Sequence, residues 1–390
     1  MSSENGMGDL RYKRVSRTRP CLICGKPDWC SRTTDDSISF CARVTAGADR
    51  LSRKENWGVF YHDRDLLNHT FEKAREPRNF RKQQTEEILS APLEIRDFIY
   101  NAMLRLSPAS DYDILIDGTK GLAERGLENF ADYGGLPCSV SERKYIAAQA
   151  RRLLNQNFPA FVRENPHGLR HVPGFWIDES GEANLWQNRD YLQPLLLIPY
   201  RNPAGKIQAC QIRFTGVLKA DKKRYFWLSL PKMNSACSGT PLHYANWKNF
   251  GRSDSFEKPI LVTEGALKAD AAAKLCSDYF VIANGGVSCA HELIINISRG
   301  KTLYLAFDND YHENPAVVRQ LAKLLKLRFD NQTKSAKFST KILTWTRTEK
   351  GIDDALLKGE KLEKITVLEW FSALDNQSRI EVQKTWEIEN

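Results

Sequence analysis

The sequence predicts a mixed α/β protein with three folded parts in series. Residues 259–359 alternate short apolar β runs with helical stretches, which is typical of βαβ units and predicts a mainly parallel sheet flanked by helices. The part before it combines helical apolar spacing with a small antiparallel β region, so it is of the α+β type. Near the N-terminus, four cysteines crowd into one short module. A chain of 390 residues is long enough for two or three such domains.

The order of these parts predicts boundaries along the chain. The expected segments are a flexible basic arm over 1–20, the cysteine module over 21–70, a charged linker over 71–84, the helical and β middle part over 85–250, the parallel-sheet domain over 251–360 and a C-terminal tail over 361–390. In the middle part, Ser110 is expected to cap a helix that opens with Asp111. The chain contains no G-x-x-x-x-G-K-[ST] phosphate loop, which excludes an ATP-driven helicase motor.

Local patterns predict individual strands. In the middle part they are Leu195–Pro199, Lys206–Phe214 and Arg224–Leu228, with an Asn-Pro-Ala-Gly turn at 202–205 joining the first two. In the sheet domain they are Ile260–Thr263, Tyr279–Ala283, Thr302–Phe307 and Lys341–Trp345, with a helix over Ala266–Leu275 after the first.

Charge favours a polyanionic partner. The formal net charge is +9 and the basic residues come in clusters, so nucleic acid is the leading candidate, and a soluble protein that is merely basic is the alternative. The sequence has no apolar run of about 18 residues and no apolar stretch of a signal peptide. We therefore expect a cytoplasmic protein with no membrane partner.

The cysteine module has the spacing of a metal site. Cys21, Cys24, Cys30 and Cys41 follow the pattern C-x2-C-x5-C-x10-C. Four thiolates complete a tetrahedral Zn²⁺ site, and the metal substitutes for a core that so small a module lacks. A closed four-ligand site is structural rather than catalytic. Two alternatives stay open: free or redox-active thiols, and a mixed site in which His62 replaces one cysteine.

Basic and aromatic residues surround these cysteines. Lys26 and Arg43 could supply phosphate contacts, and Trp29 could stack on a base of single-stranded DNA. For Trp29, packing beside the metal is the alternative.

Acidic residues follow the strands of the predicted sheet. Glu264 comes directly after the first strand, and Asp308 and Asp310 follow the third. A glycine turn, Gly285-Gly286, follows the strand between them. Ligands of open α/β sheets bind beyond the carboxyl ends of the strands, and clustered carboxylates bind hard cations, so we expect Mg²⁺ or Mn²⁺ at this edge.

A second acidic pair follows the last predicted strand. Asp353 and Asp354 could complete the metal site, or they could simply occupy the N-terminus of a helix, where the helix dipole favours acidic residues.

These motifs together resemble a known domain. Val-Thr-Glu-Gly-Ala-Leu-Lys-Ala-Asp (262–270), Ile-Ala-Asn-Gly-Gly (282–286), Leu-Ala-Phe-Asp-Asn-Asp (305–310) and Lys-Gly-Ile-Asp-Asp (350–354) look like a TOPRIM domain, the metal-binding fold shared by primases, topoisomerases and some nucleases. Upstream, Leu-Ala-Glu-Arg-Gly-Leu (122–127), Gln-Ile-Arg-Phe (211–214) and Thr-Pro-Leu-His-Tyr (240–244) resemble the polymerase core of DnaG-type primases. With the zinc-ribbon-like module, the resemblance spans most of the chain in the same order.

The resemblance implies roles for particular residues. It implies that Glu264, Asp308 and Asp310 bind the catalytic metal and that basic residues of the β region lie near template or nucleotide. The expected nucleotide or nucleic-acid contacts are Arg213, Lys222, Lys223, Arg224, Lys268, Gly285 and Gly286. For Lys222–Arg224, a solvated hairpin is the alternative.

The sequence also departs from the primase pattern. Small residues after the Asp-x-Asp pair are replaced by Tyr311, His312 and Glu313, and the chain ends soon after the sheet domain. The closer likeness is to primases of phages, plasmids and other mobile elements.

The function expected from the resemblance is primer synthesis on single-stranded DNA. The implied partners are the template, nucleoside triphosphates and a replicative helicase acting in trans, in a prokaryotic cell. A metal-dependent TOPRIM nuclease and a non-catalytic single-stranded DNA-binding protein are the alternatives, whereas a topoisomerase needs a large gate domain for which the chain has little room.

Overall fold

The computed structural model of the chain describes residues 12–52, 57–62, 88–188, 191–217, 223–249, 258–309, 314–331, 339–346 and 348–387. The chain divides into two compact units, residues 1–85 and 86–390. Each is described by itself below. The expected linker at 71–84 lies outside the described residues.

The first unit is a small antiparallel sheet with the order β1-β2-β3-β5-β4. Its strands are β1 Tyr12–Arg14, β2 Ser31–Thr33, β3 Ile38–Cys41, β4 Arg50–Leu51 and β5 Gly58–Tyr61. Among the described residues, its buried apolar cluster comprises Val15 and three of the four cysteines, with a few partly buried apolar neighbours. So small a core needs another source of stability, and a bound metal ion would supply it. Residues 12–14, expected in a flexible arm, instead form an edge strand paired with β2.

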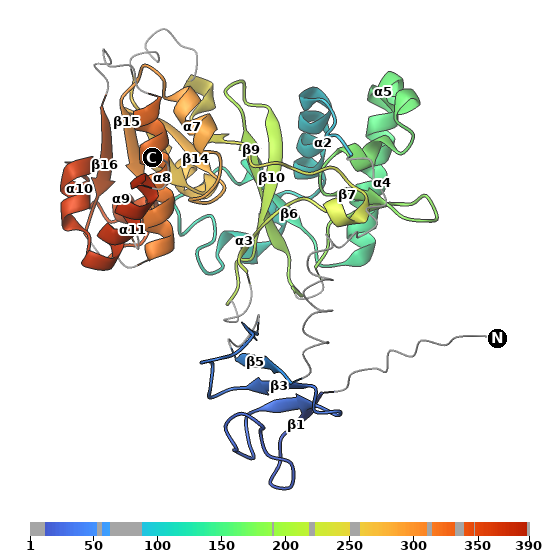
Figure 1. The fold of residues 1–390 in the computed structure, drawn as a ribbon. Helices are drawn as coiled ribbons and strands as arrows, with labels where there is room; N and C mark the ends of the chain where they lie inside the picture. The colour runs from blue at the N-terminus through green and yellow to red at the C-terminus, as the bar shows by residue number, and fades with distance from the viewer. Residues whose placement is uncertain are drawn as a thin grey trace. The chain divides into compact units, whose positions relative to one another are not determined.

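The second unit begins with the α+β part (Figure 1). Its antiparallel sheet has the order β11-β10-β9-β6, and a separate hairpin pairs β7 with β8. The strands are β6 Gly134–Leu136, β7 Phe175–Ile177, β8 Ala183–Leu185, β9 Leu195–Arg201, β10 Ile207–Arg213 and β11 Tyr225–Trp227. The helices are α2 Leu93–Leu106, α3 Asp113–Ile116, α4 Val140–Asn157 and α5 Pro159–Glu164.

The predicted turn between β9 and β10 forms for a clear reason. The Asn202 side-chain oxygen accepts hydrogen bonds from the backbone N–H groups of Ala204 and Lys206, both at 2.9 Å. Gly205 has a φ of +81°, a backbone conformation that residues with a Cβ rarely adopt. The Asn-Pro-Ala-Gly sequence thus supplies the local contacts that close the hairpin.

The predicted helix cap at Ser110 is wrong. Ser110 lies inside a short 3-10 helix, Ala109–Asp111, and α3 begins only at Asp113. The segment folds against β6, a strand that sequence patterns did not reveal because Gly134 and Gly135 have no apolar side chains to report burial.

The C-terminal part of the second unit is a six-stranded sheet with the order β12-β14-β13-β15-β16-β17. The four central strands run parallel and the two edge strands are antiparallel to their neighbours. The strands are β12 His243–Tyr244, β13 Ile260–Glu264, β14 Phe280–Asn284, β15 Leu303–Ala306, β16 Thr340–Thr344 and β17 Glu363–Thr366. The mixed α/β fold with a mainly parallel sheet is therefore confirmed.

Helices cover both faces of this sheet. Ile260 and Val262 of β13 pack in one apolar cluster with α7, α8, α10 and α11, whereas Leu261 packs in another with α6 and α9. This alternation follows from the two-residue period of a strand. The helices are α6 Ala266–Leu275, α7 His291–Ile297, α8 Pro315–Asp330, α9 Ile352–Leu357, α10 Val367–Ala373 and α11 Asn376–Glu387. None of the described helices is long and apolar enough to cross a bilayer.

Two expected boundaries of the sheet domain differ in the structure. Residues 363–387, expected within a tail, supply β17, α10 and α11, and Trp370 and Val382 are fully buried in the sheet core. At the other end, β12 at His243–Tyr244 already pairs with β14, before the expected start at 251. Edge strands and capping helices carry weaker patterns than central strands, so the sequence did not reveal them.

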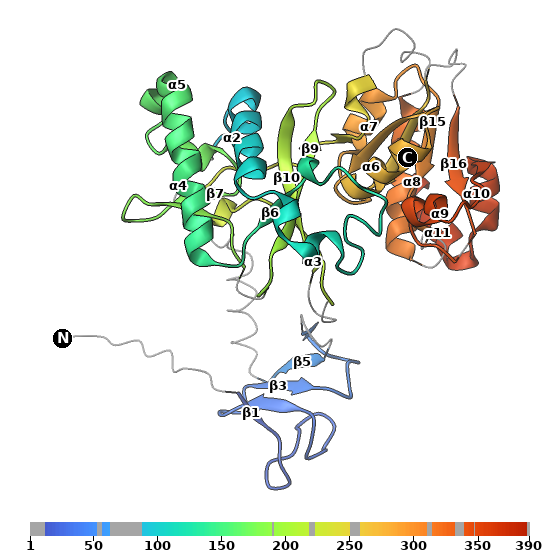
Figure 2. The ribbon, with the colours of Figure 1, turned by 180° about the vertical axis from the view of Figure 1, so that it is seen from behind.

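An apolar cluster joins the two parts of the second unit. Leu122 and Leu127 of the α+β part, with Leu196 of β9, pack against Ala266 and Leu267 of α6. Figures 1 and 2 show β9 and β10 between the helices α2, α4 and α5 on one side and the six-stranded sheet with its helices on the other. The segment around residues 120–127 is thereby held beside the sheet domain.

Candidate functional site

The four predicted cysteines come together. Their Sγ atoms all lie within 4.8 Å of one another, with Cys24 to Cys30 at 3.7 Å and Cys30 to Cys41 at 3.9 Å. A tetrahedron of thiolates at the usual Zn–S distance of about 2.3 Å has S···S edges of about 3.8 Å. The cluster therefore has the dimensions of a zinc-ribbon site.

Backbone N–H groups near the cysteines donate hydrogen bonds to their sulfur atoms, which stabilises thiolates. The N–H of Ala42 donates to Sγ of Cys30 at 3.4 Å, and the N–H of Val44 donates to Sγ of Cys41 at 3.3 Å. His62 is not a member of the cluster, and its Nε2 is hydrogen-bonded to Oγ of Ser39 at 2.8 Å. A site in which His62 replaces a cysteine is thus not what the fold builds.

Of the residues expected to contact nucleic acid around the cysteines, two are presented to solvent. Lys26 is exposed, and Trp29 is 66% exposed and has a φ of +68°. A bulky residue in the left-handed region is strained, and such strain is often found at functional positions. Arg43 is engaged within the module, since its guanidinium pairs with Asp28 at 2.7 Å.

Two of the predicted acids, Glu264 and Asp308, follow neighbouring parallel strands of the sheet. In the parallel register Glu264 lies opposite Asn284, and Thr263 lies opposite Ala306. Glu264, Asn284 and Asp308, which comes two residues after β15, therefore occupy the same carboxyl edge. Asp308 is buried, and Asp310 lies outside the described residues.

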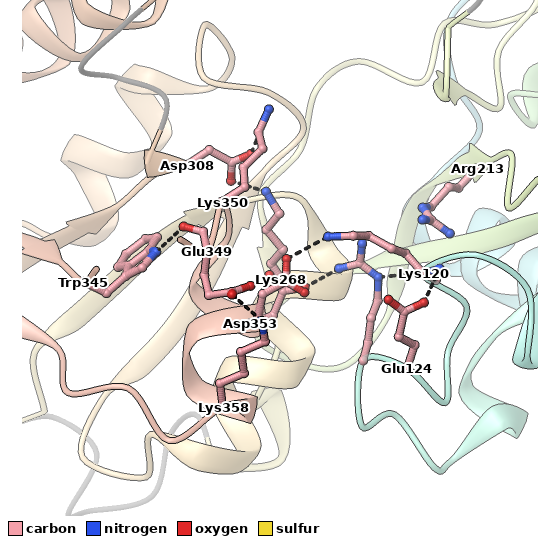
Figure 3. A network of polar contacts seen from close by, with 12 residues as sticks. Lys120, Glu124, Arg213, Lys268, Asp308, Trp345, Glu349, Lys350, Asp353 and Lys358 are labelled. Atoms are coloured by element: carbon pink, nitrogen blue, oxygen red, sulfur yellow. Dashed lines mark hydrogen bonds and ion pairs between the residues drawn. The ribbon is translucent and has the colours of Figure 1, made fainter. Parts of the chain in front are cut away.

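Cations of the chain face these acids (Figure 3). The ammonium of Lys268 forms an ion pair with Oδ1 of Asp308, and Lys350 lies 3.8 Å from Oδ2 of the same carboxylate. Burial by itself would lower the pKa of Lys268, but the carboxylates of Asp308, Asp353 and Glu264 together raise it above its usual value. Lys268, expected at the nucleotide, thus lies among the carboxylates.

The second acidic pair lies in the first turn of α9 and pairs with the α+β part of the unit. Asp353 forms a buried ion pair with Arg125, and Asp354 pairs with Lys120 at 2.8 Å. Oδ1 of Asp353 is buried and has no hydrogen-bond partner among the described residues. The helix-terminus alternative placed these acids at a helix start, as the structure has them, and the structure adds specific basic partners.

Arg213 is the most deeply buried basic residue among the expected contacts, at 1% exposure. Its Nε donates to the Tyr225 hydroxyl at 3.0 Å, and its Nη1 has no hydrogen-bond partner among the described residues. Burial lowers the pKa of this guanidinium. Figure 3 shows Arg213 on the side of the acidic edge from which Lys120 approaches.

The basic cluster after Arg213 is only partly described. Lys222 lies outside the described residues, and Lys223 is exposed. Nη1 of Arg224 donates to the carbonyl oxygens of Phe214 and Gly216, at 3.0 and 3.2 Å. Arg224 therefore clamps the β10–β11 hairpin, and Lys223 is the described member of the cluster that faces solvent.

In the glycine turn Gly285-Gly286, the first glycine allows close packing. A Cβ on Gly285 would lie 2.4 Å from Cζ2 of Trp227, and the Gly285 carbonyl accepts a hydrogen bond from Nε2 of Gln211 at 3.2 Å. Gly285 thus lets the sheet edge meet the β9–β11 sheet closely. The Gly286 carbonyl accepts the N–H of Cys289 at 2.8 Å.

Several residues at this edge were not singled out from the sequence. They are Arg125, Lys120, Lys350 and Asn284. Arg125 and Asp353 are separated by 228 positions, so no local pattern could link them. Asn284 was noticed only as part of a glycine turn, although its Oδ1 is buried and has no partner among the described residues.

Comparisons with known proteins give a consistent but distant picture. A domain of unknown function (DUF3854) matches residues 247–362. No curated protein matches the sequence. Among solved structures, the chain is similar to the E. coli primase catalytic core, with 13% identity over 76% of this chain and 98% of that chain and a TM-score of 0.46.

Two further solved structures extend this likeness. The zinc-binding and RNA polymerase domains of the Aquifex aeolicus primase match at 12% identity over 98% of this chain and 92% of that chain, with a TM-score of 0.40. A DNA primase domain from Pseudomonas aeruginosa matches at 16% identity over 52% of this chain, with a TM-score of 0.38. The chain spans 60% of that domain.

Proposed function

We propose that this chain is a primase-like nucleotidyltransferase that synthesises primers on single-stranded DNA, with the six-stranded sheet serving as a TOPRIM domain. The observation that carries the proposal is the carboxyl edge of β13 and β15, where Glu264 and Asp308 lie. A second observation supports it: Arg213 of β10 is a buried guanidinium whose Nη1 lacks a partner among the described residues. Phosphoryl transfer needs both kinds of charge, acids for the metal and a cation for the polyphosphate.

Carboxylates are the ligands that a hard cation prefers, although the described acids do not form a group of three with oxygens within 4.8 Å of one another. Glu264 and Asp308 offer carboxylate oxygens, and Oδ1 of Asp353 is a buried oxygen without a hydrogen-bond partner among the described residues. Glu264 and Asp308 would hold Mg²⁺ or Mn²⁺, and the sequence motif adds Asp310. When bound, such an ion orients triphosphate oxygens and lowers the pKa of the attacking 3′-hydroxyl.

The chain's own residues have complementary tasks. Nη1 of Arg213 binds a phosphate oxygen of the incoming nucleotide. Arg125 holds Asp353, and therefore α9, against the α+β part, so the acidic edge keeps its shape. Lys223 contacts the template backbone from the β10–β11 hairpin. The hydroxyl of Tyr225 accepts a hydrogen bond from Nε of Arg213, which orients the guanidinium.

The first unit binds the template in this proposal. A Zn²⁺ on the four cysteines stabilises the small sheet, and Lys26 with the exposed Trp29 contacts single-stranded DNA by charge and stacking. The partners are the template, nucleoside triphosphates and a replicative helicase in trans, and the setting is a prokaryotic replicon such as a phage or plasmid.

A primer-extension experiment tests the proposal. Purified protein is incubated with primed and unprimed single-stranded DNA, labelled ribo- and deoxyribonucleotides, and Mg²⁺ or Mn²⁺. We expect products longer than the input, and we expect Asp308→Asn to abolish them. Asp278→Asn is the matched control. Asp278 is an exposed acid that precedes β14, so it lies at the amino end of the strand, away from the acidic carboxyl edge.

Two other outcomes would support the alternative functions. Shortened DNA without extension, lost in Asp308→Asn, would make the protein a nuclease. Tight DNA binding without any chemistry in either metal would make it a binding protein, and either result overturns the proposal.

A further inference from the structure

A lysine lies where the helix dipole disfavours one. Lys268 is the third residue of α6, which begins at Ala266 directly after Glu264 and Gly265. The first turn of a helix favours acidic side chains and disfavours cations. A cation at this position must therefore be stabilised by its tertiary neighbours.

The fold leaves room for this side chain at Gly351. A Cβ on Gly351 would lie 3.2 Å from Cε and 3.4 Å from Cδ of Lys268. The aliphatic stem thus passes directly along the backbone that leads into α9, and only 17% of the side chain is exposed. The position of the ammonium is consequently fixed by packing.

The ammonium reaches the centre of the acidic edge. It pairs with Oδ1 of Asp308, and Asp353 and Glu264 both contribute attraction. Two neighbouring cations, Arg125 and Lys350, hold other positions. Arg125 is committed to Asp353, and Lys350 is 62% exposed and 3.8 Å from Asp308. Lys268 is thus the largely buried cation that neutralises Asp308 at this edge.

We propose that Lys268 is a resident cation of the carboxylate cluster that competes with the divalent ion for Asp308. A metal ion binding Asp308 must displace the ammonium, so Lys268 weakens metal binding and keeps the acids neutralised between catalytic cycles. This inference rests on the proposed function only in taking the acidic edge as the metal site. It concerns binding, which is measured without primer synthesis.

The test measures Mn²⁺ binding to the full-length, zinc-loaded protein, using the electron paramagnetic resonance signal of free Mn²⁺. We expect Lys268→Met to bind Mn²⁺ about tenfold or more tightly than the wild type, because the positive charge that competes with the metal ion for Asp308 has been removed. Lys274→Met is the matched control on the same helix, where Lys274 donates to the carbonyl of Gly126, and it should leave the affinity unchanged. Asp308→Asn should lose the site in either background.

Folding is followed in the same samples. Without metal, Lys268→Met leaves Asp308 buried without its ion-pair partner, so its melting temperature should fall and should recover on adding Mn²⁺. Lys268→Arg keeps the charge and should bind Mn²⁺ no more tightly than the wild type. Equal Mn²⁺ affinity in the wild type, Lys268→Met and Lys268→Arg would overturn the inference, as would weaker binding by Lys268→Met. If the Mn²⁺ affinities are as expected but the protein does not extend primers, the result counts against the proposed function and not against this inference.

Discussion

The Arg125–Asp353 ion pair should be the main polar tie between the α+β part and the sheet domain. Both side chains are buried, at 6% and 1% exposure, so removing Arg125 leaves a buried carboxylate. Breaking one side of a buried pair costs about 3–5 kcal/mol, because the remaining charge is uncompensated. Here the loss should reach the upper part of that range, since Oδ1 of Asp353 already lacks a partner among the described residues.

A neighbouring pair supplies the matched control. Lys120 and Asp354 join the same two segments, but their side chains are 45% and 22% exposed, so solvent screens the pair. Removing it should cost only about 0–1 kcal/mol. We therefore expect Arg125→Met to lower the free energy of unfolding by at least three times as much as Lys120→Met.

Urea and thermal unfolding followed by circular dichroism at 222 nm measure this difference, because the described helices all lie in the second unit. For a unit of this size the expected drop in melting temperature for Arg125→Met is roughly 5–15 °C. Adding Asp353→Asn to Arg125→Met should recover much of the loss, since the buried charge is then gone. If Arg125→Met costs no more than Lys120→Met, the ion pair does not stabilise the junction and the reasoning fails.

Two further predictions concern the first unit. Elemental analysis should find about one zinc per chain in the wild type and in Cys138→Ser, whose thiol is exposed outside the cluster, but none at this site in Cys24→Ser; a folded, metal-free module would contradict this. Trp29→Ala should weaken single-stranded DNA binding by roughly 5- to 150-fold in fluorescence anisotropy, the equivalent of about 1–3 kcal/mol of base stacking, with zinc content unchanged. Leu22→Ala, which removes another exposed apolar side chain of the module, is its control, and equal affinities for all three proteins would rule out stacking by Trp29.

Strand positions and the metal-like cysteine cluster could be predicted from the sequence because both depend on local patterns. The apolar run at Ile260 reports a buried strand whatever surrounds it, and parallel strands place their carboxyl ends at one edge. This is why Glu264 and Asp308 were expected together. The four cysteines were found in the same way, since their spacing along one short segment already constrains them to meet.

Only the tertiary structure decided which charges face each other. The pairing of Lys268 with Asp308 and of Arg125 with Asp353 depends on how α6 and the segment at 120–127 pack, and no local pattern encodes a contact between residues so far apart. The burial of Arg213 has the same origin. Its strand position gave its place in the sheet, but the lack of a partner for Nη1 among the described residues follows from the packing of β10 against its neighbours. A side chain's type is written in the sequence, whereas its solvation and its partners are properties of the packed fold.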